Sequence, residues 1–217
     1  MDKMEHKEKD MKWTTLDSEY LFRRPWLTAR KDRVGLPNGH IIEEYYVLEY
    51  PDWINVIAIT PDDRFVFVRQ YRYALGKTVN EIVAGVCEEG EDPLETAKRE
   101  LMEETGYGGG KWTKTATLSA NASAMSNLTH CYIARGVELI GGRCLDEGED
   151  LEVCLFSREE VRGMLERGEI WQSLMAAPLW KMFAEEKWPK LHFLGREIFF
   201  PREGENYTPY FFPLFMM

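Results

Sequence analysis

The sequence lacks several features that would each indicate a different class of protein. Its 217 residues contain no apolar run near the roughly 18 residues of a membrane-spanning helix. The first 13 residues have no apolar core of a secretion signal, and the 4 cysteines form neither a CxxC pair nor a cluster with zinc spacing. A net charge of −10 argues against nucleic-acid binding, which needs a basic surface. We therefore expect a reduced, cytoplasmic, globular protein that binds neither membranes nor nucleic acid.

Short apolar and β-branched stretches, separated by turn signals, run along most of the chain and predict β-strands. We expect strands at residues 20–28, 39–50, 54–60, 65–70, 79–84, 112–118, 128–135 and 151–156. Helices are expected at residues 93–105, from Ser157 with a capping box completed by Glu160, and at residues 172–186 with Pro178 as a candidate interruption. Residues 106–110 would form a loose connector. This order predicts an α/β sandwich.

Residues 85–107, GVCEEGEDPLETAKRELMEETGY, are the most informative stretch of the chain. Asp92 is a good N-cap, Pro93 suits the first helical position, and Glu95 is placed to close a capping box. Gly106 follows the last turn, where a left-handed residue is favoured. Both ends of this helix are therefore specified locally.

The helix carries an apolar face beside an acidic one. Offsets of three and four residues bring together the apolar side chains of Leu94, Ala97 and Leu101. The same spacing gathers the carboxylates of Glu100, Glu103 and Glu104. Three glutamates alone more often form a solvated acidic surface than a binding site. The alternative is a site for Mg²⁺ or Mn²⁺, which prefer hard oxygen ligands.

The surrounding pattern decides between the acidic surface and the metal site. The glycine that opens this stretch is followed after five residues by Glu91, and after seven more by RELMEETGY, residues 99–107. The stretch resembles the Nudix box, with an aromatic Tyr107 where an aliphatic residue is usual. The preceding RQYRYALGKTVNEIVAG, residues 69–85, resembles the ADP-ribose pyrophosphatase-like branch, except that Val83 replaces a proline. The chain is thus similar to Nudix hydrolases of that branch.

The resemblance implies a fold and a division of the chain. The fold would be a Nudix α/β/α sandwich with a mixed sheet, preceded by a small N-terminal β-subdomain. Residues 1–50 would hold a charged tail and this subdomain, residues 51–190 the hydrolase domain, and residues 191–217 a C-terminal extension that packs on the body or at a dimer interface. Similar hydrolases exchange the subdomain across a dimer; we expect a homodimer here, and the sequence leaves the exchange open. Trp26, Tyr45 and Tyr46 would then stack on the adenine of the partner's substrate, with core packing as the alternative role.

The resemblance also implies a metal site for Mg²⁺ or Mn²⁺. Its ligands would be the carboxylates of Glu100, Glu104, Glu103 and Glu81 and the carbonyl of Ala84. Arg99 would support catalysis by orienting the glutamates. Glu103 would support catalysis as an additional metal ligand, and Glu91 would brace the preceding loop. Arg72 would contact the diphosphate, with a surface salt bridge as an equal alternative.

A separate acidic loop, residues 145–150, would supply the catalytic base. Its ending matches a family pattern E-x-x-E-V that places Glu149 at the position of the base. The alternative is a plain solvent-facing loop. A base on such a loop reaches the attacking water only after the loop closes.

These residues predict metal-dependent hydrolysis of a nucleoside diphosphate linked to another group. From ADP-ribose the products would be AMP and ribose 5-phosphate. Ser123 lies where ADP-ribose hydrolases usually carry a proline, so other nucleotide sugars stay open as substrates. The sequence also leaves open a non-catalytic nucleotide-sugar sensor and an isomerase of the same fold. The retained glutamates and the lack of a basic helix-turn-helix segment count against the sensor.

Overall fold

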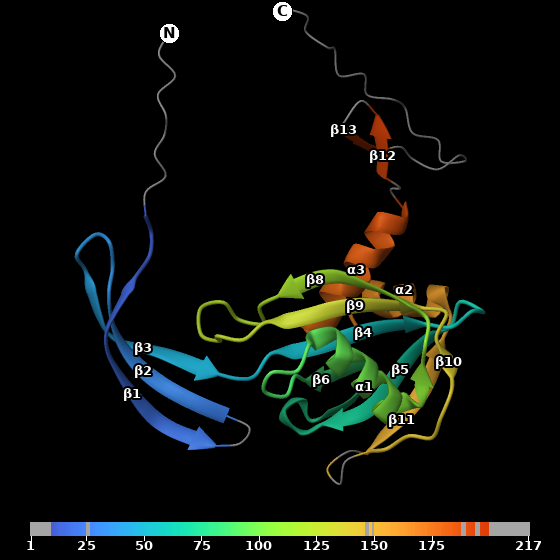
Figure 1. Ribbon diagram of the computed structural model, residues 1–217, viewed down its shortest axis with the longest axis horizontal. Helices are drawn as coiled ribbons and strands as arrows, with labels where there is room; N and C mark the ends of the chain where they lie inside the picture. Colours follow the sequence, from blue (N-terminus) through green and yellow to red (C-terminus); the bar gives the residue numbers. More distant parts are fainter. Residues whose placement is uncertain are drawn as a thin grey trace, which may run out of the picture.

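The computed structural model describes residues 10–24, 27–145, 148, 150–187, 190–193 and 196–199, with side chains up to residue 186. The chain begins with a three-stranded sheet and continues into a six-stranded sheet flanked by helices (Figure 1). The three-stranded sheet lies to one side of the six-stranded one.

The six-stranded sheet forms the body of the protein. Its strand order is β11 (Leu151–Phe156), β5 (Phe65–Arg72), β6 (Lys77–Val86), β4 (Trp53–Ile59), β9 (Thr129–Arg135) and β8 (Lys111–Leu118). The strands β4 and β9 run parallel, whereas the other neighbouring pairs are antiparallel. The sheet is therefore mixed, as expected. A short 3₁₀ helix, η1 (Tyr73–Leu75), connects β5 to β6.

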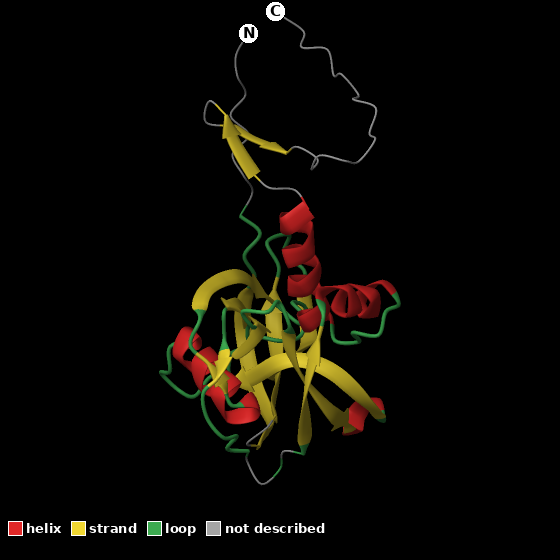
Figure 2. Cartoon of the chain, turned by 90° about the vertical axis from the view of Figure 1, so that its right-hand side faces the viewer, coloured by secondary structure: helices red, strands yellow, loops and turns green. Residues whose placement is uncertain are grey.

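The sheet separates two apolar clusters, each covered by helices. On one face lies α1 (Pro93–Thr105), whose Ala97 and Leu101 are fully buried against the sheet. On the opposite face, α2 (Arg158–Glu166) and α3 (Ser173–Lys187) pack around buried strand residues such as Phe65 (Figure 2). This layering confirms the predicted α/β/α sandwich.

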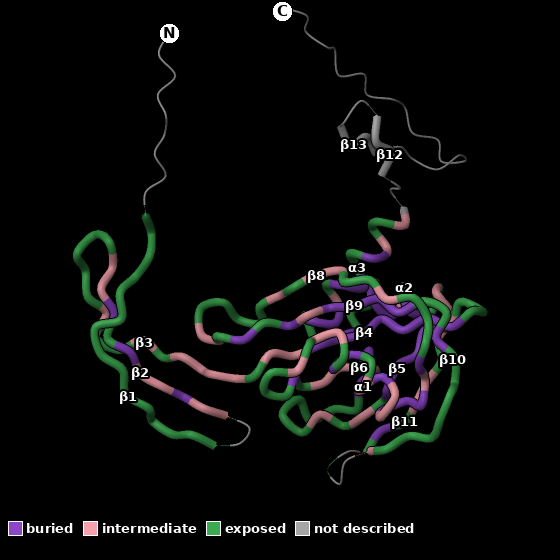
Figure 3. The backbone as a smooth tube through the Cα atoms, in the orientation of Figure 1, coloured by how far each residue is buried: buried purple, intermediate pink, exposed green. Residues whose placement is uncertain are grey.

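The N-terminal sheet is far less buried than the body (Figure 3). It pairs three antiparallel strands in the order β1 (Thr14–Arg24), β2 (Leu27–Gly35) and β3 (Ile41–Glu49). The predicted strand at residues 20–28 is wrong, because that range crosses from β1 into β2. Ion pairs such as Lys31 Nζ to Glu19 Oε2 at 3.0 Å join these strands, and every residue of β1 is exposed. Register shifts between Thr15 and Asp17 and between Tyr20 and Phe22 interrupt the two-residue period of β1, so its alternation does not mark the strand boundary.

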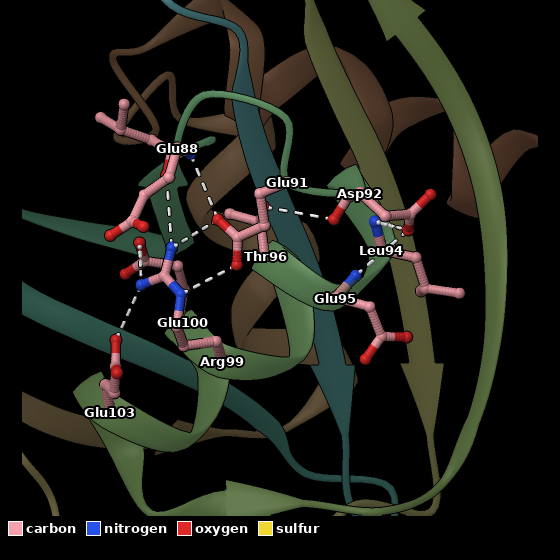
Figure 4. A network of polar contacts seen from close by, with 10 residues as sticks. Glu88, Glu91, Asp92, Leu94, Glu95, Thr96, Arg99, Glu100 and Glu103 are labelled. Carbon is pink, nitrogen blue, oxygen red and sulfur yellow. Dashed lines mark hydrogen bonds and ion pairs between the residues drawn. The ribbon is translucent and has the colours of Figure 1, made fainter.

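Local contacts form both ends of α1, and Figure 4 shows those at its start. Asp92 caps the first turn and accepts two backbone N–H groups, and Gly106 ends the helix with a φ of 77°. The predicted capping box is only half formed. The Glu95 carboxylate is not bonded to the backbone N–H of Asp92; its Oε1 accepts a hydrogen bond from Lys98 Nζ at 2.7 Å instead. Asp92 and Gly106 therefore set the position of the helix.

Pro178 lies inside α3 without interrupting it, so the predicted interruption is wrong. A proline cannot donate to the carbonyl four residues earlier, which here is that of Leu174. That carbonyl accepts a hydrogen bond from Asn55 Nδ2 on β4 at 2.6 Å. Asn55 is 1% exposed, so a buried strand amide replaces the missing helix hydrogen bond.

Two smaller elements complete the body. Residues 106–110 are not the loose connector expected, because β7 (Tyr107–Gly108) pairs with β10 (Glu138–Leu139). The capping box predicted at the start of α2 is confirmed, since Ser157 and Glu160 bond to each other's backbone.

Beyond α3, β12 (Lys190–Phe193) pairs with β13 (Arg196–Phe199). The apolar end of the predicted extension, PYFFPLFMM, lies outside the described residues. Within the parts of the chain that the structure describes, no helix is both long and apolar enough to cross a membrane.

Candidate active site

Arg99 on α1 contacts three glutamates at once (Figure 4). Its Nε and Nη2 donate to the two carboxylate oxygens of Glu91, each at 3.1 Å. Its Nη1 donates to Glu100 Oε1 and Glu103 Oε2, each at 2.9 Å. The hydrogen bonds from Arg99 favour the charged carboxylate and lower the pKa of Glu91 to about 2. This is the arrangement expected of a residue that orients the glutamates and ties the preceding loop to the helix.

Gly85, at the end of β6, leaves the space that the Glu100 carboxylate occupies. A Cβ atom on residue 85 would lie 2.1 Å from Glu100 Cδ. The Glu100 side chain is 13% exposed and Glu104 is buried, whereas the Glu103 side chain is 39% exposed. Two of the three carboxylates are thus shielded from solvent, and Glu100 lies against the backbone that directly follows Ala84.

Glu81 on β6 is buried and accepts three hydrogen bonds on one oxygen. Gln70 Nε2 donates to Glu81 Oε2 at 3.1 Å, and Arg72 donates through Nε at 3.0 Å and Nη2 at 2.6 Å. Arg72 therefore forms a salt bridge, but with a buried partner rather than on the open surface. Because the Arg72 side chain is 42% exposed, it also has an edge free to meet an anion.

A cavity of about 640 Å³ opens beside these residues. Its wall contains Arg72, Glu81, Ala84 and Gly85, together with Trp53, Asn55 and residues 171–175. This volume lies within the range of roughly 300–1,000 Å³ found for small-molecule sites. The fold therefore brings several of the predicted metal-binding and substrate-binding residues to one opening.

The predicted ligands have the oxygen donors that a hard divalent cation prefers, but in this structure their carboxylates pair with arginines. Among the described residues, no three carboxylate, histidine or cysteine side chains are grouped closely enough to hold a metal ion. Instead, Arg99 pairs with Glu100 and Glu103, and Arg72 pairs with Glu81. All the predicted donors are oxygens, which Mg²⁺ and Mn²⁺ prefer. The space beside Gly85 keeps the Glu100 carboxylate against the backbone of β6. A cation held by both Glu100 and the Ala84 carbonyl would need this proximity.

Other predicted residues are not brought to the cavity. Glu149 and Trp26 lie outside the described residues. Tyr45 is described, and its hydroxyl donates to the backbone carbonyl of Ser123 while its ring meets Trp13 edge-on at 5.7 Å. The cavity wall, as far as the structure describes it, does not include Tyr45. A role for Tyr45 in substrate binding would therefore have to come from a partner subunit.

The structure also adds residues that the sequence did not predict. Gln70 and Arg72 both donate hydrogen bonds to Glu81. Residues two apart lie on the same face of a strand, so the position of Gln70 on β5 could have indicated this contact. Trp53 and Trp171 line the cavity but belong to no motif. Only the fold brings them to the site, so no local signal could have identified them.

Comparisons with known proteins identify the family of the chain. Residues 13–48 match the nucleoside diphosphate sugar hydrolase N-terminal domain, and residues 50–177 match the NUDIX domain. The chain is 31% identical over 169 residues to the ADP-ribose pyrophosphatase of Bacillus subtilis (strain 168), covering 77% of this chain and 91% of that protein. It is 33% identical over 162 residues to the methanol dehydrogenase activator of Bacillus methanolicus, covering 73% of this chain and 86% of that protein.

A solved structure described as an ADP compounds hydrolase shares the fold, with a TM-score of 0.71 and 22% identity. The superposition covers 82% of this chain and 96% of that one. The chain therefore belongs to the Nudix hydrolase family, in its ADP-ribose pyrophosphatase-like branch.

Proposed function

We propose that this enzyme hydrolyses the diphosphate linkage of ADP-ribose in a metal-dependent reaction that yields AMP and ribose 5-phosphate. The observation that supports the proposal is the group of glutamates that Arg99 holds on α1, with Glu100 packed against Gly85, whose backbone lines a cavity of small-molecule size. The choice of substrate is supported by relatives named ADP-ribose pyrophosphatase in Bacillus subtilis and Mycobacterium tuberculosis.

Mg²⁺ or Mn²⁺, when bound, would neutralise charge that develops on the phosphoryl oxygens. The residues proposed to hold it are Glu100, Glu104, Glu103 and Glu81, with the carbonyl of Ala84. Arg72 presents its exposed edge to the diphosphate and holds it in place. Arg99 keeps its glutamates oriented while the substrate enters.

The proposed reaction is the attack of a water molecule on one phosphorus of the diphosphate. Glu149 accepts the proton of this water as the P–O bond forms. The bond from the same phosphorus to the bridging oxygen breaks, and the second phosphate leaves with that oxygen. Glu149 precedes β11 in the sequence, and we propose that it reaches the water only when the acidic stretch of residues 145–150 closes over the substrate.

We also propose that two chains form a homodimer through the N-terminal sheet. Large apolar side chains are exposed on this sheet, among them Leu16, Tyr20, Leu21, Phe22 and Tyr46. A second chain seated on this sheet would cover them. Trp26 and Tyr45 of one chain would then approach the substrate of the other.

The proposed function is tested by measuring phosphate release, after phosphatase coupling, from a panel of nucleoside diphosphate compounds. The panel holds ADP-ribose, ADP-glucose, GDP-mannose, UDP-glucose, NADH and a dinucleoside polyphosphate, each with Mg²⁺, Mn²⁺ or EDTA. We expect metal-dependent turnover concentrated on ADP-ribose. Turnover concentrated on another compound would correct the substrate, and binding without any turnover would favour a sensor.

A further inference from the structure

The two carboxylate oxygens of Glu81 are held unequally. The residue is 4% exposed and lines the cavity. Its Oε2 accepts two hydrogen bonds from Arg72 and one from Gln70. Among the described residues, no donor is hydrogen-bonded to Oε1. A single oxygen of this buried carboxylate therefore depends on one charged donor residue and one uncharged one.

Arg72 would face two anions once a diphosphate enters the cavity. Its Nη2 lies 2.6 Å from Glu81 Oε2, while 42% of its side chain is exposed. A diphosphate at the exposed edge attracts the same guanidinium and carries more negative charge than one carboxylate. Movement of Arg72 toward the diphosphate would weaken two of the three hydrogen bonds to Glu81. Because a buried carboxylate without partners is strongly destabilised, Glu81 needs a donor that does not follow the diphosphate.

Gln70 is placed to be that donor. Val68 is the direct strand partner of Glu81, so Gln70 is the diagonal neighbour of Glu81 in the β5–β6 pair. Arg72 lies two residues further along the same face of β5. The Gln70 amide is uncharged, so a diphosphate attracts it far less than it attracts a guanidinium. The two strands thus hold Gln70 Nε2 at 3.1 Å from Glu81 Oε2 whichever anion Arg72 contacts.

We propose that Gln70 is a positioning residue that keeps the buried Glu81 carboxylate in place while Arg72 turns toward the diphosphate of the substrate. Gln70 contacts Glu81 but is not part of the cavity wall that the structure describes, so it acts through the carboxylate and not on the substrate. This inference rests on the proposed function, because it requires a diphosphate bound to Arg72.

The test measures nucleotide binding in EDTA, where neither a metal ion nor turnover takes part. Calorimetry compares the ADP affinity of the parent chain with that of Gln70→Leu, in which Glu81 keeps only Arg72 as a donor. The variant should bind ADP about tenfold more weakly, because the diphosphate must draw Arg72 away from a carboxylate that has no other donor. Tyr71→Leu is the matched control and should bind ADP like the parent, since Tyr71 is exposed on the other face of β5.

A double-mutant cycle separates this role from a general effect of the substitution on the fold. In a Glu81→Gln background no buried charge competes for Arg72, so Gln70→Leu should change ADP affinity by less than about twofold. Equal ADP affinity in the parent and in Gln70→Leu, or the same loss in the Glu81→Gln background, would overturn the inference. Absence of hydrolysis together with the expected pattern of ADP affinities would overturn only the proposed function.

Discussion

Gly85 positions a predicted metal ligand by having no side chain. A Cβ atom there would collide with Glu100 at 2.1 Å and push its carboxylate away from β6. We predict that Gly85→Ala weakens Mn²⁺ binding and lowers kcat by about 10-fold to 100-fold, as disturbed ligand orientation does in other metal enzymes. Gly142→Ala is the control, since a Cβ atom on Gly142 would meet nothing within 4 Å. Equal metal affinity in both variants would show that Glu100 does not bind the ion.

Glu91 makes a pH-dependent contribution to stability. Hydrogen bonds from Arg99 are the largest cause of its pKa of about 2, against an ordinary value of 4.5. The folded state therefore favours the charged carboxylate, and its stabilisation is present above pH 4.5 and is lost as pH falls toward 2.

We predict that Glu91→Gln lowers the free energy of unfolding by about 1–2 kcal/mol at pH 7. Urea unfolding of both proteins should show the difference in free energy of unfolding decreasing from pH 7 to pH 3. It decreases because the parent loses the stabilisation from the charged Glu91 carboxylate. Glu95→Gln, which removes an exposed carboxylate of the same helix, should behave like the parent. A difference that stays constant with pH would contradict the role assigned to the Arg99 contact.

The elements differ in how much of their structure the sequence predicts. The helix α1 was predicted from Asp92 to Gly106 because its cap, its end and its apolar face are all local signals. The boundary between β1 and β2 differs from the prediction because register shifts in this pair interrupt the two-residue alternation of β1. Pro178 departs from the prediction for a different reason. Its missing hydrogen bond is replaced by Asn55, which lies far away in the sequence and meets the helix only after folding.

The pair of Asn55 and Pro178 can be tested by a double-mutant cycle. Asn55→Leu removes the donor, leaves the Leu174 carbonyl buried without its partner, and should cost about 1–3 kcal/mol in free energy of unfolding. In a Pro178→Ala background the helix can supply its own N–H, so the same change should cost less. Chemical unfolding of the four proteins measures the coupling. Strictly additive effects would show that the proline and the amide act independently.

At the scale of the whole molecule, the active site depends on parts of the chain that no single motif contains. The Nudix box predicts the glutamates and their arginine, but Trp53 and Trp171 reach the cavity from β4 and from the segment before α3. Such residues are found only when the fold is known. By contrast, the family and the layered architecture follow from the sequence, because the box places the helix directly after a strand of the six-stranded sheet.

The exposed N-terminal sheet makes a prediction about assembly. If it forms the dimer interface, Leu21→Glu on β1 should place a charge within it and shift the protein toward the monomer. Light scattering across a concentration series would measure the shift. Leu139→Glu is the control, because Leu139 is equally apolar and 66% exposed but lies on β10 of the body. A monomeric parent chain would contradict the proposed homodimer.

The most direct test of the central claim is the effect of Glu104→Gln on ADP-ribose hydrolysis in Mg²⁺. Glu104 is the buried member of the acidic group, so the amide should fit the same space while losing the charge that holds the ion. We predict a fall in kcat of about 10³-fold, since a bound ion supplies several kcal/mol of charge stabilisation. Glu95→Gln on the same helix should stay within about twofold of the parent. Turnover by Glu104→Gln at the parent rate would contradict the assignment of the α1 glutamates as the metal site.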